Sequence, residues 1–262
     1  MPAFYAHHSF GSKVAEQLGG ELKDTVEKYR PQFNIGLQGP DLFFFYKPYR
    51  SNPVNKYGNA LHGSSAYPFL NNAIGIISKK GRNSAEYAYI LGFTCHFILD
   101  SECHSYIDEM IKLTGVSHIE IEEEFEKHML RRNGKDPIGH PIWRLVPKDR
   151  STAEAILPFY EVSLEEIKKS LSGLKLVKHL FTAPCPVKQA VINTSLKAVG
   201  KYDKYKGLMN QRIDNPACAV TNAGLSQRLD SAVDIALQMI ESLDESIRLG
   251  TALDNRFDRT FL

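Results

Sequence analysis

The chain has 262 residues, of which 43% are hydrophobic and 24% are charged, the composition of an ordinary globular protein. Its net charge of +2 argues against a polyanionic partner, and no stretch reaches the ~18 uninterrupted apolar residues of a membrane-spanning helix. The N-terminus also lacks the basic and apolar regions of a secretory signal, so we expect a cytoplasmic protein.

Helical patterns dominate the N-terminal half. Apolar residues spaced by four predict an amphipathic helix over residues 12–29, with Ser12 as its N-cap. Residues 31–68 are rich in Pro, Gly, Asn and Tyr and are interpreted as a long irregular loop, a kind of segment that is usually functional. Further helices are expected over residues 83–106 and beyond, and near residues 119–130.

The C-terminal half shows equally clear helix signals. Ser151–Glu154 and Ser163–Glu166 both have the form of capping boxes, which predict helix starts. Residues 186–206 are expected to be helical too. The strongest pattern is the last, because the apolar residues of 225–247 recur at spacings of three and four.

Period-two patterns typical of strands are scarce, so the predicted fold class is all-α, a multi-helix bundle. We expect residues 1–150 to form a helical core and residues 151–262 to form a C-terminal helical part packed on the same domain. The 4 cysteines include no CxxC pair, so a thiolate zinc site has no support and reduced, packing cysteines are expected.

The sharpest chemical signal is the run from His96 through Asp100 to His104. At about 100° per residue, three side chains spaced by four residues span roughly 80° of a helix and project from one face. The intervening residues are apolar, so this face is expected to be buried, and buried charged groups need compensation. A divalent cation supplies it, because imidazole and carboxylate are standard zinc ligands. The alternative is a metal-free, hydrogen-bonded ladder of the same three side chains.

A second pair with the same spacing, His118 and Glu122, begins the next helix and can bind one ion together. The alternative for its glutamate is a solvated face, because acidic residues crowd positions 120–126. Three further candidates lie upstream, each with an ordinary alternative. Asp41 can cap the aromatic run that follows it, His62 can be a surface histidine, and His7 adjoins a second histidine.

Taken in order, these motifs resemble the zinc-dependent phospholipase C family, which is related to the zinc-dependent single-strand nucleases. The similarity covers about residues 1–130, and the motifs that carry it are His7 to Gly11, Gly39-Pro-Asp41, Leu61-His62, His96xxxAsp100xxxHis104 and His118xxxGlu122. The resemblance implies an all-helical fold of the phospholipase C and zinc nuclease type, with additional C-terminal helices. It also implies three clustered zinc ions and cleavage of phospholipid phosphodiesters.

The resemblance also implies a set of metal ligands. By its motifs, His62, His96 and Asp100 hold one zinc. His104, His118 and Glu122 hold a second. His7 and Asp41 contribute to a third, and Asp41 is the candidate general base. Secreted members use the amino group of an N-terminal Trp as a ligand. This chain begins Met-Pro, and the amine of Pro2 is a candidate to replace that ligand if the initiator Met is removed.

The predicted function is therefore that of a hydrolase of phosphoesters, a phospholipase C-like phosphodiesterase that uses a zinc-activated water and two to three zinc ions. The expected partner is a small-molecule or lipid phosphoester, with transient contact at a membrane surface and no nucleic acid. A zinc nuclease or nucleotide phosphodiesterase, and a non-catalytic metal-binding interaction module, are the alternatives. Aromatic residues among positions 43–57 can form a wall for a choline-like head group, although core packing is the favoured interpretation of the Phe cluster.

Overall fold

The described part of the chain, residues 4–262 of a computed structural model apart from the side chain of Lys204, consists of helices joined by turns and loops and contains no strand, so the predicted all-α fold class is confirmed. The N-terminal half contains α1 (Phe4–Gln17), α2 (Gly20–Lys28), α3 (Arg30–Gly36), the 3-10 helix η1 (Gly39–Phe45), α4 (Pro53–His62), α5 (Tyr67–Lys80), α6 (Ala85–Thr114) and α7 (His118–Arg132). The C-terminal half contains η2 (Ile142–Leu145), α8 (Arg150–Ile156), η3 (Leu157–Phe159), α9 (Leu164–Phe181), α10 (Pro186–Ala198), α11 (Tyr202–Tyr205), η4 (Lys206–Leu208), α12 (Cys218–Leu249) and η5 (Asn255–Asp258).

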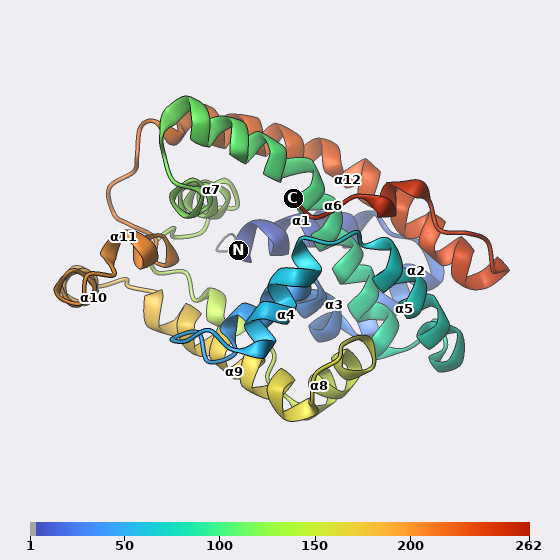
Figure 1. Ribbon diagram of the computed structural model, residues 1–262. Coiled ribbons are helices and arrows are strands. Elements are labelled where there is room, and N and C mark those ends of the chain that lie inside the picture. Colours follow the sequence, from blue (N-terminus) through green and yellow to red (C-terminus); the bar gives the residue numbers. More distant parts are fainter. Residues whose placement is uncertain (1–3) are drawn as a thin grey trace.

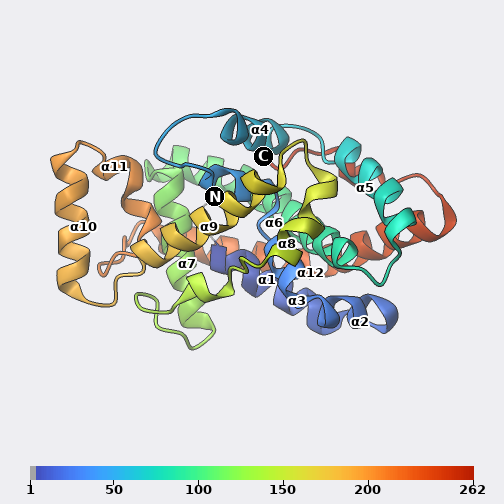
Figure 2. The ribbon, with the colours of Figure 1, turned by 90° about the horizontal axis from the view of Figure 1, so that it is seen from below.

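Helix α6 is the centre of the structure, and most other helices pack around it. Figure 1 shows α6 running through the middle of the molecule, with α12 alongside it and α4 in front. Helices α1, α3 and α12 contact α6 directly. Figure 2 shows α10 and α11 at one end of the molecule and α2 and α5 at the other. No helix in the described part is long and apolar enough to cross a membrane.

A close approach between α3 and α6 fixes the position of the segment that follows α3. A Cβ on Gly92 would lie 2.1 Å from the Phe33 carbonyl oxygen, and one on Gly36 would lie 2.2 Å from the Tyr89 carbonyl oxygen. Only glycine lets the two backbones come so near. Because η1 follows α3 directly, this packing also sets η1 against α6.

The predicted long loop over residues 31–68 is wrong, because this stretch forms α3, η1, α4 and the start of α5. Four of the prolines that suggested a loop, Pro31, Pro40, Pro53 and Pro68, stand in the first turns of these helices, where a proline loses no helical hydrogen bond, and Pro48 lies in the turn between η1 and α4. Asn52 is the N-cap of α4, and its side chain accepts a hydrogen bond from the Asn55 backbone N–H. The turn-forming residues thus start helices rather than interrupt them.

Several predicted helix ends are also corrected. Ser12 is not an N-cap, since it lies inside α1 and donates to the His8 carbonyl, and the predicted helix over 12–29 breaks at Gly20, whose φ is +53°. The cap of α8 is Asp149 rather than Ser151. The capping box at Ser163 is confirmed. The predicted helix over 186–206 ends at Ala198 and resumes as α11, whereas the last predicted helix is confirmed as α12.

The C-terminal half packs directly behind the segment that carries Asp41. Helix α9 contacts η1 so closely that a Cβ on Gly173 would lie 2.1 Å from the Phe45 carbonyl oxygen. Helix α8 packs against α3 and α6. The division of the chain at residue 150 stays a prediction.

Candidate metal centre

Five separate elements bring histidine and carboxylate side chains to one place on the side of α6. Helix α6 supplies its three in-register residues, and α1, η1, α4 and α7 supply the others. All of these side chains are nearly buried except His118. The residues predicted from the sequence are thus together in the structure: His7, Asp41, His62, His96, Asp100, His104, His118 and Glu122.

Asp41, His62, His96 and Asp100 form the first donor group, in which one ligand atom from each residue lies within 4.8 Å of all the others. His62 Nε2 is 3.0 Å from Asp41 Oδ1 and 3.1 Å from Asp100 Oδ2. His96 Nε2 is 3.2 Å from the same Asp100 oxygen. Asp41 therefore lies with the donors of the predicted first zinc.

His104, His118 and Glu122 form the second donor group, again with ligand atoms within 4.8 Å of one another. His118 Nε2 is 3.0 Å from Glu122 Oε1, one helical turn away on α7. The rings of His104 and His118 face each other with centroids 5.4 Å apart. The rings of His62 and His104 are 5.8 Å apart, so the two donor groups adjoin.

His7 reaches the centre through the second oxygen of Asp100. Its Nε2 lies 3.1 Å from Asp100 Oδ1, and its ring stacks on that of His96 with centroids 4.6 Å apart. The Asp100 carboxylate therefore faces different imidazoles with each of its oxygens. Pro2, the stand-in for the family's N-terminal ligand, lies outside the described residues.

Donor distances of 3.0–3.2 Å fit hydrogen bonds as well as a shared tetrahedral metal, and the lack of a hydrogen bond at His96 Nε2 favours the metal. Ligands about 2.0–2.1 Å from a tetrahedral zinc lie about 3.3 Å from one another, close to the observed spacing of 3.0–3.2 Å. Within the described part of the chain, His96 Nε2 makes no hydrogen bond although it lies 3.2 Å from Asp100 Oδ2. A buried ring nitrogen without a hydrogen bond is costly unless a metal binds it, so these residues fit a zinc ion.

The ionisation states of the side chains in the first donor group suit the binding of a cation. Burial opposes ionisation of Asp41, but nearby positive charge, including that of the His62 and His96 imidazoles, lowers its pKa to about 2. The same kind of neighbours hold the pKa of Asp100 well below its ordinary value. Burial lowers the pKa of His96 to about 3, which keeps this ring neutral and able to donate a lone pair.

The pKa of His62 is shifted in the opposite direction, to a higher value. Burial lowers its pKa, but the carboxylates of Asp41 and Asp100 outweigh this effect and raise the pKa to about 10. In the protein without metal, His62 is therefore the cation that compensates the two aspartates. A zinc ion would take over that role and displace the proton.

A glycine next to Asp41 makes room for the His96 ring. Gly39 has a φ of +47°, a conformation that favours glycine. A Cβ at this position would lie 2.2 Å from His96 Cδ2 and 2.7 Å from His96 Nε2. The Gly39-Pro-Asp41 motif thus both turns the chain and admits the neighbouring ligand.

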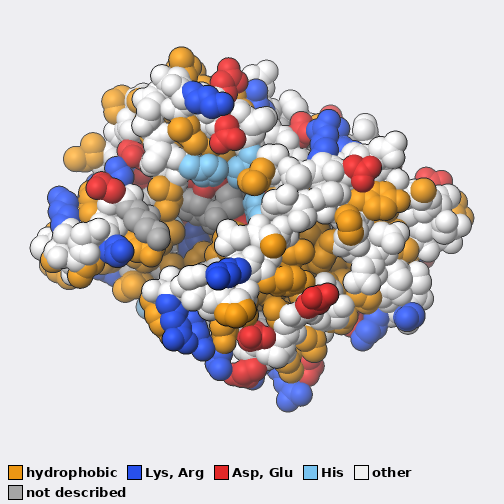
Figure 3. All heavy atoms as spheres, in the orientation of Figure 1, with side chains coloured by type: hydrophobic (Ala, Val, Ile, Leu, Met, Phe, Trp, Pro, Cys, Tyr) orange, Lys and Arg blue, Asp and Glu red, His pale blue; other side chains and the backbone are white. Residues whose placement is uncertain are grey.

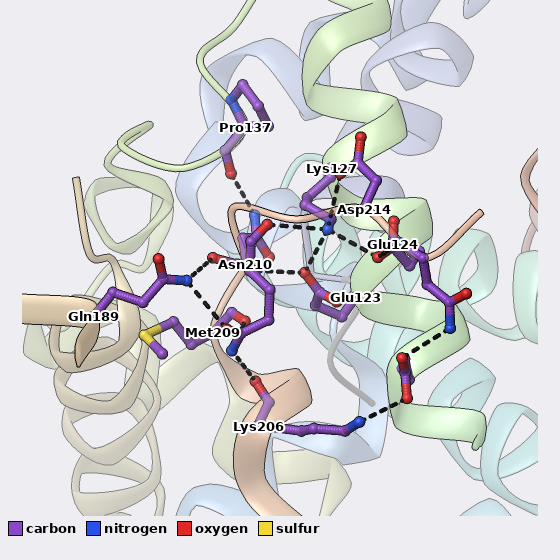
Figure 4. Close-up of polar contacts among 12 residues, drawn as sticks. Glu123, Glu124, Lys127, Pro137, Gln189, Lys206, Met209, Asn210 and Asp214 are labelled. Atoms are coloured by element: carbon purple, nitrogen blue, oxygen red, sulfur yellow. Dashed lines mark hydrogen bonds and ion pairs between the residues drawn. The ribbon is translucent and has the colours of Figure 1, made fainter. Parts of the chain in front are cut away.

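The acidic run on α7 is buried and is not a solvated face. Glu122 points to His118, whereas Glu123 and Glu124 bind the ammonium of Lys127, which is 0% exposed. Figure 4 shows this ammonium between the two glutamates and Asp214. The network ties α7 to the loop after η4, and burial raises the pKa of Glu123 to about 7 against the opposing effect of Lys127.

An open cavity of about 340 Å³ leads to both donor groups. Figure 3 shows histidine side chains in a hollow near the middle of one face of the molecule. The cavity is lined by Phe44, Asn59, His62, His104, His118, Ile119, Glu122 and Leu262. A smaller space of about 30 Å³, enough for one small ion or water, lies between His7, Asp100, His104 and Glu122.

The aromatic run after Asp41 divides between core and cavity. Phe43 is 0% exposed and packs on Tyr160, so core packing is confirmed for it. Phe45 and Tyr46 are buried as well, and Tyr49 is 77% exposed. Phe44 is the residue of this run that lines the cavity.

Residues 6–173 match the family model described as zinc dependent phospholipase C. The chain belongs to the zinc-dependent phospholipase C family. A comparison with curated proteins gave no match, and neither did a comparison with solved structures. The family match extends past the resemblance seen in the sequence, through α8 and into α9, and includes every predicted ligand.

Sequence reasoning missed the residues that reach this phospholipase C family centre from the end of the chain. Phe261 places its ring 5.0 Å from that of His62, and Leu262 lines the cavity. The sequence held no motif to indicate them beyond two phenylalanines spaced by four, at 257 and 261. Asn59, three residues before His62 on α4, was also not considered.

Proposed function

We propose that this protein is a zinc-dependent, phospholipase C-like phosphodiesterase that cleaves the phosphodiester bond of a phospholipid. Its membership of the zinc-dependent phospholipase C family supports a hydrolase, and the buried donor groups support the metal. The observation that carries the proposal is the pairing of two donor groups, which adjoin at the His62 and His104 rings, beside an open cavity. A structural metal site is closed by protein ligands, whereas a catalytic one opens to substrate.

The proposed ligand sets follow the geometry of the two donor groups. Asp41, His62, His96 and Asp100 are assigned to one zinc ion. His104, His118 and Glu122 are assigned to a second. His7, facing the other oxygen of Asp100, is assigned to a third ion that Asp100 shares with the first.

Bound zinc would supply Lewis acidity toward phosphoryl oxygens and bring the pKa of water toward ~7. Asp41 is proposed as the general base, because its carboxylate is ionised and lies beside the histidines of the first donor group, although its lowered pKa makes it a weaker base than an ordinary aspartate. The alternative is that Asp41 is a metal ligand and not a base, because its Oδ1 lies 3.0 Å from His62 Nε2. His104, His118 and Glu122 line the cavity wall, so the second donor group is open to the substrate.

The cavity indicates the type of substrate. Its volume of about 340 Å³ suits a phosphorylated head group, at the lower end of the range for small-molecule sites. The Phe44 ring on its wall can contact a quaternary ammonium group by cation–π attraction. A choline-type phospholipid, reached by transient contact with a membrane surface, is therefore the substrate class that we propose.

The test is product analysis with short-chain phosphatidylcholine in water enriched in ¹⁸O. Attack at phosphorus should give diacylglycerol without label and phosphocholine with one labelled oxygen. A chelator should abolish the reaction, and added zinc should restore it.

Single-stranded DNA provides the matched comparison. Cleavage of DNA alone would replace this proposal with a zinc nuclease. Zinc-loaded protein that cleaves neither substrate would indicate a non-catalytic metal-binding module.

A further inference from the structure

The chain returns to the metal centre after its last long helix. Figure 1 shows the segment after α12 running back from the far end of that helix to the middle of the molecule, beside α6. We name residues 253–262 the C-terminal strap. Leu253, Phe257 and Phe261 of the strap are buried, so they attach it to the core.

The strap is anchored to the two elements that carry His62 and His104. Next to the C-terminal end of α4, Ser65 Oγ donates to the Phe257 carbonyl at 3.3 Å, and the Ala66 N–H donates to the Arg259 carbonyl at 3.2 Å. On α6, Glu102 binds the guanidinium groups of Arg256 and Arg259. Glu102 stands between Asp100 and His104 in the sequence, so the strap spans the distance from one ligand-bearing helix to the other.

Phe261 contacts the candidate ligands with both its backbone and its ring. Its carbonyl oxygen lies 2.7 Å from His104 Nδ1, which is shorter than the 3.2 Å contact of the same nitrogen with the Asp100 carbonyl within α6. The Phe261 ring lies over that of His62 at 5.0 Å and an interplanar angle of 32°, and 5.7 Å from that of His96. At 2% exposed, Phe261 also shields these rings from water.

The hydrogen bond to Phe261 decides which nitrogen of His104 can bind a metal. A carbonyl oxygen only accepts, so His104 Nδ1 must carry the proton. The lone pair of a neutral imidazole is then on Nε2. Metal-binding histidines commonly donate their other N–H to such a carbonyl, which fixes both the tautomer and the ring orientation.

We propose that the C-terminal strap is a positioning element of the metal centre, in which the Phe261 carbonyl sets the tautomer of His104 and the Phe261 ring holds His62 in place. The strap lies outside residues 6–173, the part of the chain that matches the family model. The role rests on the proposed function in one respect, which is that His62 and His104 bind zinc.

The first measurement is the tautomer of His104 in zinc-free protein, read from long-range ¹H–¹⁵N NMR spectra and assigned with His104→Gln. Wild type should show the proton on Nδ1. A variant that ends at Thr260 should shift the proton toward Nε2, since only the longer Asp100 contact remains. The variant Phe261→Leu retains the carbonyl and should keep the wild-type tautomer.

The second measurement is zinc affinity, determined by competition with a chelating dye. The variant that ends at Thr260 should bind its weakest zinc about 10–100-fold less tightly than wild type, the usual effect of losing a partner of a ligand. Phe159→Ala is the matched control, because Phe159 is buried in the neighbouring aromatic cluster and packs on Tyr89 and Phe69. It should lower the melting temperature without changing affinity or tautomer.

A shortened protein with wild-type tautomer and wild-type zinc affinity would overturn the proposal. So would an equal loss of affinity in Phe159→Ala, because general destabilisation would then account for the effect. Wild-type protein that binds no zinc would contradict the proposed function instead, while the tautomer in zinc-free protein would still test the strap.

Discussion

Replacing Asp100 by Asn removes the carboxylate that the first donor group shares with His7. In the structure, Asp100 Oδ2 lies 3.1 Å from His62 Nε2 and 3.2 Å from His96 Nε2, and Oδ1 lies 3.1 Å from His7 Nε2. Asn keeps the shape of the side chain, but it loses the negative charge and one of the two ligand oxygens. We therefore expect the ions at His62 and His7 to be lost.

The second donor group should survive this substitution. Asp100 comes no closer to His104 Nδ1 than 3.9 Å through its side chain, and His118 and Glu122 lie on a different helix. Zinc content should thus fall from two or three ions per chain to one. If affinity at the damaged site falls about 100-fold, up to about 2.7 kcal/mol of zinc-dependent stability disappears.

The assay is elemental analysis of dialysed protein, together with thermal unfolding at fixed free zinc. A loss of about 2.7 kcal/mol corresponds to a decrease of roughly 5–10 °C in the zinc-dependent part of the melting temperature. Glu109→Gln, an exposed carboxylate on the same helix, is the control and should behave as wild type. An Asp100→Asn protein with full zinc content and wild-type affinity would refute the shared-ligand assignment.

Three further predictions follow from the same geometry. The substitution Asp41→Asn distinguishes the two roles proposed for Asp41. If Asp41 is a metal ligand, the zinc content should fall. If it is only the general base, kcat should fall about 10²–10⁴-fold at full zinc content. Glu122→Gln should remove the second zinc, and Glu120→Gln should not, because Glu120 pairs with Lys206 away from the histidines; the reverse result in elemental analysis would show that the register on α7 is wrong. Since the pKa of His62 is raised from 6.5 to about 10, its contribution to metal-free stability is full below pH 6.5 and is lost as the pH rises toward 10. Zinc binding at pH 7 should accordingly release about one proton from His62, measurable by calorimetry in buffers of different ionisation enthalpy, and a His62→Gln protein should release less.

The ligands on α6 could be predicted from the sequence because their arrangement is local. A spacing of four residues places His96, Asp100 and His104 on one helical face whatever the rest of the chain does. The same holds for His118 and Glu122 at the start of α7. The order of the motifs along the chain then indicated the family, and the family match confirmed it.

Other features depend on tertiary contacts that a local pattern does not contain. The prolines of residues 31–68 have two common uses, in loops and in first helical turns, and packing of α3 against α6 selects the second. The acidic run on α7 is buried only because Lys127 and the loop near Asp214 meet it there. Phe261 approaches His104 across 157 residues of sequence.

The most direct test of the metal centre is X-ray diffraction from crystals of the protein, with data collected on both sides of the zinc absorption edge. We expect anomalous peaks within coordination distance of His62, His96 and Asp100, and of His104, His118 and Glu122. Maps without such peaks, with water or direct histidine–carboxylate hydrogen bonds between these side chains, would contradict this expectation.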